Sequence, residues 1–172
     1  MKVVSDQDPG QKTYIALKNL VDNSWYMQRK AYENGLYKNG SIGFLKEFCT
    51  VKMCTARRSG HSTAIARLCC EYFNKAILFC HNQQTAENLH LQFRPYVNNI
   101  TKELKDFIEL NNGESKYHFF STGNLQGTRG IETEAMIIDC ASFMSEKKKE
   151  EIEDLAIVYL RPPAPFFLIY VE

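Results

Sequence analysis

A phosphate-binding loop is the first chemistry that the sequence suggests, in the stretch TVKMCTARRSGHSTAIARLCCEYF at residues 50–73. Such a loop needs a strand that ends abruptly, a turn whose backbone N–H groups point inward, and a helix whose positive N-terminus faces the anion. Its usual pattern is G-x-x-x-x-G-K-[ST]. The two glycine positions hold Thr55 and Gly60, the lysine position holds His61 and the hydroxyl position holds Ser62. Because only part of the pattern is met, an ordinary strand-to-helix turn is the alternative.

An aspartate at the end of a later apolar run supplies a second part of the same chemistry. EAMIID at residues 134–139 has the form in which a strand delivers a carboxylate to a magnesium ion beside bound phosphates. We therefore expect Ser62 and Asp139 to hold Mg²⁺, and the 134–139 strand to lie beside the strand that precedes the loop. The alternative is a buried strand that only ends in a polar residue.

Basic side chains near the loop could complete a phosphate site. Arg57 and Arg58 could clamp a phosphate or stabilise charge during its transfer, and Arg129 in TRGIE could reach the same place. The alternatives are a solvated basic turn for the pair and a surface turn for Arg129. The predicted phosphate contacts are Arg57, Arg58, Ser59, Gly60, His61, Ser62, Thr63 and Arg129.

The elements that must position these residues alternate between strand and helix. Apolar, β-branched or aromatic runs of strand length occupy residues 48–56, 75–81, 116–121, 134–139 and 165–171. Helical spacing or propensity marks residues 11–34, 62–73, 84–110 and 145–160. This alternation predicts an α/β fold with a mostly parallel central sheet between layers of helices. We expect one domain over residues 1–172, with residues 1–47 forming an N-terminal helical segment packed on the core.

Charge and cysteine usage restrict the classes of function. Twenty-one Lys and Arg residues against 20 Asp and Glu residues give a net charge of +1, so no global field favours nucleic acid or an anionic membrane. Six cysteines without a C-x-x-C pair lie mostly in apolar runs, which is typical of reduced, buried thiols. With no apolar run of signal-peptide or membrane-span length, we expect a cytoplasmic protein that does not contact a membrane.

Two stretches together resemble a known family. ARRSGHSTAIARLCCEYF with KAILFCHNQQTAENL, followed by STGNLQGTRGIETEAMIIDCASFM, is similar to the ATPase domain of bacteriophage large terminases, the motors that drive DNA into capsids. The resemblance covers residues 48–143. It implies a P-loop NTPase core, a phage origin with a location in the host bacterial cytoplasm, and ATP or GTP with Mg²⁺ as the ligand.

Three departures from the family argue against a packaging motor. His61 replaces the lysine, Cys140 replaces the glutamate after Asp139, and the sequence holds no nuclease domain. Losing a charge-assisted hydrogen bond costs about 1.5 to 3 kcal/mol, and general-base assistance is worth about 100- to 10,000-fold in rate. Phosphate binding could survive these changes, whereas fast hydrolysis would not.

Three functions follow from these residues. The favoured one is a catalytically degenerate NTPase-like accessory protein that acts by binding a protein partner, a second copy of itself, a nucleotide or DNA. The second is a slow Mg²⁺-dependent ATPase or GTPase in a phage DNA transaction. The third is a metal enzyme or a Cys/His enzyme that reuses His61, Asp139 and Cys140, and in that case no nucleotide binds.

Overall fold

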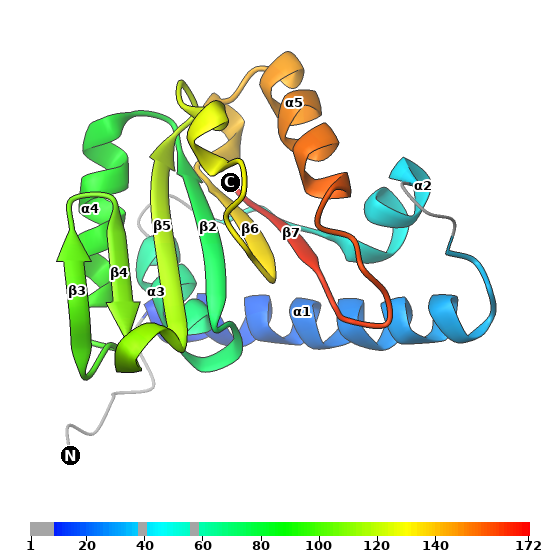
Figure 1. Ribbon diagram of the computed structural model, residues 1–172, viewed down its shortest axis with the longest axis horizontal. Coiled ribbons are helices and arrows are strands. Elements are labelled where there is room, and N and C mark those ends of the chain that lie inside the picture. The colour runs from blue at the N-terminus through cyan, green and yellow to red at the C-terminus, as the bar shows by residue number, and fades with distance from the viewer. Residues whose placement is uncertain (1–8, 38–40, 56–58) are drawn as a thin grey trace.

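Seven strands form one mixed sheet in the computed structural model, which describes residues 9–37, 41–55 and 59–172 (Figure 1). The strand order is β1-β7-β6-β2-β5-β4-β3. The strands are β1 (Thr50–Met53), β2 (Lys75–Cys80), β3 (Ile100–Leu104), β4 (Phe107–Leu110), β5 (Ser115–Ser121), β6 (Ala135–Asp139) and β7 (Phe167–Val171). Strands β1, β7, β6, β2 and β5 are parallel, while β4 and β3 join β5 as an antiparallel hairpin.

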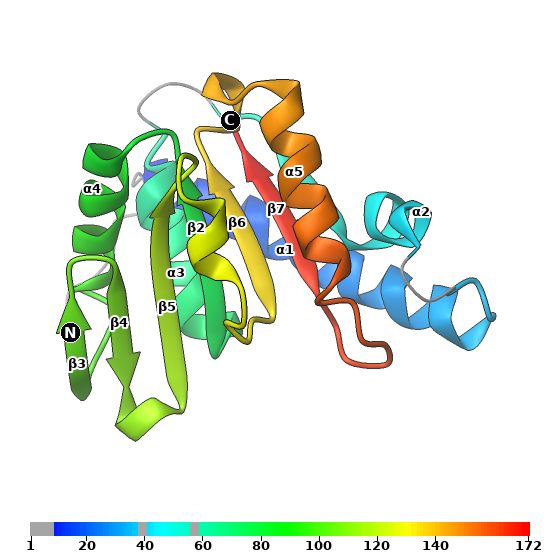
Figure 2. The ribbon, with the colours of Figure 1, turned by 45° about the horizontal axis from the view of Figure 1, so that its top comes forward.

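Helices cover both faces of this sheet. The main helices are α1 (Pro9–Glu33), α3 (His61–Tyr72), α4 (Gln83–Phe93) and α5 (Glu146–Ile157), and a short helix α2 (Ile42–Phe44) continues into the helical turn Leu45–Cys49 before β1. Figure 2 shows α5 in front of β6 and β7, with α1 and α3 behind the sheet. The predicted α/β fold with a mostly parallel sheet flanked by helices is therefore confirmed.

The central strands are apolar on both sides because each face of the sheet is buried. In β2, Ala76 and Leu78 pack in the core under α1, α3 and α4, whereas Ile77 and Phe79 pack in the core under α5. This alternation follows from the two-residue period of a strand. It explains why β2 and β6 are continuous apolar runs, the pattern expected of buried parallel strands.

The predicted neighbour of β1 was wrong. We expected β6 to lie beside β1, but β7 lies between them, paired in parallel with both. Strand order is set by contacts between distant parts of the chain, and β7, whose five residues are all buried, suits a position that is covered on both faces. The expected strand at 48–56 is also shorter, because residues 45–49 form a helical turn and β1 spans only Thr50–Met53.

The predicted long helix over residues 84–110 was also wrong. Helix α4 ends at Phe93, and the hairpin of β3 and β4 follows. Apolar residues at 100, 104, 107 and 108 match the spacing of a helix as well as that of a hairpin, which is why periodicity alone misled. Asn99 and Asn111, both with positive φ, bound the hairpin, and asparagine tolerates that conformation better than most residues.

The N-terminal helix crosses the back of the sheet and is tied to it by polar contacts. Gln28 is buried in α1, where its amide group donates to the carbonyl oxygen of Phe166 at 2.9 Å and accepts from the N–H of Phe166 at 3.2 Å. Ser24 donates to the carbonyl oxygen of Phe48 at 2.7 Å. The predicted packing of a helical segment against the core thus has direct contacts. None of the helices within the described residues is long and apolar enough to cross a membrane.

Candidate functional site

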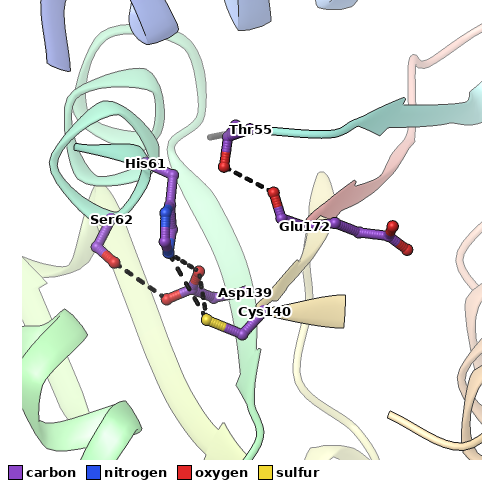
Figure 3. A network of polar contacts seen from close by, with 6 residues as sticks. All are labelled: Thr55, His61, Ser62, Asp139, Cys140 and Glu172. Carbon is purple, nitrogen blue, oxygen red and sulfur yellow. Dashed lines mark hydrogen bonds and ion pairs between the residues drawn. The ribbon is translucent and has the colours of Figure 1, made fainter. Parts of the chain in front are cut away.

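The candidate site lies at the sheet edge where the parallel strands β1, β6 and β7 end. The chain leaves β1 and enters a short loop, and α3 begins at His61. The loop is fastened on both sides. Thr55 donates through its N–H at 2.7 Å and its hydroxyl at 2.6 Å to the carbonyl oxygen of Glu172, and Thr13 of α1 donates to the carbonyl oxygen of Ser59 at 2.8 Å. These anchors hold the start of α3 over the ends of the strands (Figure 3).

Gly60 makes the sharp entry into α3. Its backbone is left-handed, with φ 71° and ψ 28°, and no side-chain cap is present among the described residues. Glycine adopts this conformation without steric cost. The first N–H groups of a helix have no partner within it and carry partial positive charge. A loop that ends in Gly60 therefore leaves the N-terminus of α3 without a side-chain cap.

His61, Ser62, Asp139 and Cys140 meet at this point from two separate segments of the chain (Figure 3). The Ser62 hydroxyl donates to Oδ2 of Asp139 at 3.3 Å, and Nε2 of His61 lies 3.1 Å from Oδ1 of the same carboxylate. The Cys140 thiol lies 3.6 Å from Nε2 of His61 and 3.6 Å from Oδ1 of Asp139. The expectation that Asp139 lies within reach of Ser62 is confirmed.

Hydrogen bonding to a buried carboxylate favours the protonated, positively charged form of His61. Asp139 is only 1% exposed, so its carboxylate needs a partner. The hydrogen bond that the His61 ring donates to Asp139, with a weaker contribution from Cys140, raises the pKa of His61 from its ordinary 6.5 to about 10, although burial opposes the shift. His61 is therefore an imidazolium at neutral pH, and it forms an ion pair with the carboxylate of Asp139.

Cys140 is held in an unusual backbone conformation. Its φ of 59° and ψ of 47° place it in the left-handed region, which is rare for a residue that is not glycine. The residue follows the last residue of β6, and this turn of the chain brings the thiol to His61 and Asp139. Backbone strain of this kind persists where the surrounding structure requires it, and it concentrates at functional sites.

The structure does not bring all of the predicted phosphate contacts together. Thr63 donates its hydroxyl to Gln92 of α4 at 3.0 Å. Arg129 lines a hollow on the α5 side of the sheet, beside Glu151 and Asp154. Arg57 and Arg58 lie outside the described residues.

Ser59 lies beside the site and has an unusual side chain. Its hydroxyl oxygen is buried and has no hydrogen-bond partner among the described residues. Its predicted role as a phosphate donor is compatible with that hydroxyl.

Two contacts at the site were not anticipated from the sequence. Glu172 accepts both hydrogen bonds from Thr55 at its backbone carbonyl oxygen. Any residue type could supply that oxygen, so no sequence signal marks the position. Thr13 binds the loop from a helix 46 residues earlier in the chain. Contacts to backbone atoms across such separations depend on the fold rather than on a motif.

Comparisons with known proteins leave the family open. Neither the protein-family models nor the curated proteins contain a match to this chain. The resemblance to terminase ATPase domains accordingly stays a prediction based on the motifs alone. The function has to be argued from the geometry of the site.

Proposed function

We propose that this chain is a catalytically degenerate, phosphate-loop protein that binds a phosphate-bearing ligand at the N-terminus of α3 and does not hydrolyse it quickly. The observation that carries the proposal is the meeting of Ser62, Asp139 and the uncapped start of α3 at one sheet edge, with 3.3 Å between the Ser62 hydroxyl and the Asp139 carboxylate. A strand, a tight glycine turn and a helix N-terminus in this order favour an anion. The Ser59 hydroxyl, which has no hydrogen-bond partner in the part of the chain that the structure describes, adds a donor in the loop.

The same geometry argues against fast hydrolysis. A phosphate-loop lysine must be free to reach the β- and γ-phosphates and to neutralise charge that develops during transfer. The imidazolium of His61 instead lies 3.1 Å from Asp139. The position of the expected glutamate holds the Cys140 thiol, which lies 3.6 Å from His61. Neither side chain supplies the carboxylate base that an attacking water requires.

Magnesium is not well suited to this arrangement. Mg²⁺ prefers oxygen ligands in near-ideal octahedral geometry. The carboxylate of Asp139 is flanked instead by the ring nitrogen of His61 at 3.1 Å and the thiol of Cys140 at 3.6 Å, and neither is a ligand that Mg²⁺ favours. We therefore expect phosphate or nucleotide binding that does not depend on Mg²⁺.

Equilibrium binding in the presence of a chelator tests the binding half of the proposal. Labelled ATP, GTP and a short single-stranded DNA are titrated with the wild-type protein and with the double variant Arg57→Glu with Arg58→Glu. Reversing both charges should abolish nucleotide binding and lower the salt dependence of DNA binding. For single strands, each lost phosphate contact lowers the steepness of the plot of log K against log salt concentration by about 0.7. The matched control is Lys102→Glu with Lys147→Glu, an equal charge change at exposed positions distant in sequence from the loop.

Two outcomes would contradict binding at the loop. In the first, the control weakens the interaction as much as the loop variant does. In the second, no phosphate-bearing ligand binds the wild-type protein at all. That second outcome would favour the remaining possibility, a fold used only to bind a protein partner or a second copy of itself.

A turnover assay tests the catalytic half. The wild-type protein should hydrolyse ATP slowly or not at all with Mg²⁺ present. His61→Lys combined with Cys140→Glu should raise the rate, since it restores a mobile cation and a carboxylate base worth about 100- to 10,000-fold. Hydrolysis by the wild-type protein at about 1 to 100 per second, the range of efficient phosphoryl-transfer enzymes, would show that the degeneracy argument is wrong.

A further inference from the structure

We propose that His61, Asp139 and Cys140 form a binding site for a zinc-class divalent ion. The nitrogen, oxygen and sulfur atoms that these residues offer all lie within 4.8 Å of one another. The inference goes beyond the proposed phosphate site, because it rests on three side chains and needs neither the loop arginines nor the backbone N–H groups at the start of α3.

The spacing of the three donor atoms matches three corners of a tetrahedron around zinc. Zinc binds imidazole nitrogen and carboxylate oxygen at about 2.0 Å and thiolate sulfur at about 2.3 Å, almost always with tetrahedral geometry in structural sites. Those bond lengths require about 3.3 Å between the nitrogen and the oxygen, and about 3.5 Å from each of them to the sulfur. The observed separations are 3.1 Å between His61 and Asp139, 3.6 Å between His61 and Cys140, and 3.6 Å between Asp139 and Cys140.

The chemistry of the donors selects the same class of ion. Imidazole and thiolate are ligands that suit zinc and related transition metals, whereas magnesium and calcium favour oxygen alone. One set with nitrogen, oxygen and sulfur therefore discriminates against Mg²⁺. The three protein ligands leave a fourth position free, and the side chain of His61 is 24% exposed, so solvent or a ligand oxygen can reach it.

The fold brings these three donor atoms together before any ion arrives, and a bound ion would displace the proton of the His61 ring and that of the Cys140 thiol, which pass to the solvent. His61 is the first residue of α3, and Asp139 and Cys140 follow one another at the end of β6. The left-handed backbone at Cys140 accompanies the placement of its thiol beside the other two donors. A site assembled in advance loses less conformational entropy when it binds an ion.

A cluster that is held by hydrogen bonds and binds no ion would have similar distances. The experiment must therefore distinguish such a cluster from one that binds a metal ion. The reduced, full-length protein is treated with a chelator, exchanged into buffer without chelator, and titrated with Co²⁺ as a spectroscopic probe. We expect one ion per chain, a thiolate-to-cobalt charge-transfer band, intense visible bands of tetrahedral cobalt, and displacement by Zn²⁺ but not by a large excess of Mg²⁺.

Substitutions of two of the three residues test whether the bands arise at this site. Cys140→Ser should remove the charge-transfer band, and both Cys140→Ser and His61→Gln should weaken binding by at least about 100-fold, since loss of even an outer-shell partner costs 10- to 100-fold. Cys54→Ser is the matched control, because Cys54 is an exposed thiol outside the cluster, and it should leave the titration unchanged. If Cys140→Ser does not fold, Cys140→Gly serves instead, because glycine accepts the left-handed backbone.

Three results would overturn the proposal: absence of cobalt bands in the wild-type protein, bands that persist without the Cys140 thiol, or bands that disappear in Cys54→Ser. The phosphate proposal is tested with chelator present and the metal proposal without phosphate. Failure of one therefore leaves the other standing.

Discussion

The pairing of His61 with Asp139 should make the stability of this protein fall as the pH rises. The hydrogen bond that His61 donates to Asp139 raises the pKa of His61 from 6.5 to about 10 in the folded chain. A group whose pKa is higher in the folded state binds its proton more tightly there than in the unfolded state. Its contribution to stability is fully present below pH 6.5 and is lost as the pH rises through about 10.

The linkage relation gives the size of this effect. Between the two pKa values the folded chain holds about one proton more than the unfolded chain, so stability falls by about 1.4 kcal/mol per pH unit. Raising the pH from 7 to 9 should therefore cost about 2.5 kcal/mol. The full pKa difference, from 6.5 to about 10, sets an upper limit of about 5 kcal/mol.

Urea unfolding at several pH values measures the effect. Wild-type protein and His61→Gln are compared with chelator and reductant present, and the difference between them cancels the titration of other groups. That difference should shrink by about 1.4 kcal/mol per pH unit between pH 7 and 9. His118→Gln is the control. Burial lowers the pKa of His118, so its titration affects the free energy of unfolding only at pH values below the ordinary pKa of histidine. Parallel stability curves for wild-type protein and His61→Gln from pH 7 to 9 would refute the reasoning.

Three further predictions concern stability in urea with chelator present. Cys140→Gly should raise the free energy of unfolding by roughly 0.5 to 1 kcal/mol, because a left-handed backbone costs about 1 to 2 kcal/mol in a residue with a side chain. A lower urea concentration at half unfolding would contradict this. Gln28→Leu should lower it by roughly 2 to 4 kcal/mol, because both backbone groups of Phe166 lose a buried partner. Asn82→Ala should lower it by about 1 kcal/mol, because Asn82 caps α4 through the N–H of Thr85 at 2.9 Å, while Asn82→Ser should retain most of the cap.

The sequence predicted the class of fold and the meeting of two motif residues for a clear physical reason. Buried parallel strands need apolar residues on both faces, so β2 and β6 could be recognised from composition alone. The C-terminal ends of parallel strands share one edge of the sheet, and a helix that follows such a strand begins at that edge. Ser62 and Asp139 were therefore expected to be close, although they are 77 residues apart in the chain.

The sequence could not predict features that depend on distant contacts or on backbone conformation. The insertion of β7 between β1 and β6 depends on which strands compete for one position in the sheet. The left-handed backbone of Cys140 has no local signal, since neither glycine nor asparagine stands there. Arg129 lines a hollow together with residues of α5, and the TRGIE motif carries no signal for that neighbourhood.

The contact between His61 and Cys140 changes how the two departures from the phosphate-loop pattern should be understood. In the sequence they are 79 residues apart and count as separate losses of a lysine and a glutamate. In the structure they are 3.6 Å apart and share Asp139 as a partner, and residues in direct contact do not contribute additively. A lysine at position 61 beside the existing thiol would still pair with Asp139, and a glutamate at position 140 beside the existing imidazolium would be neutralised by it. Under the proposed phosphate-loop function the two residues therefore act as one unit, and only their joint replacement should raise the rate of hydrolysis.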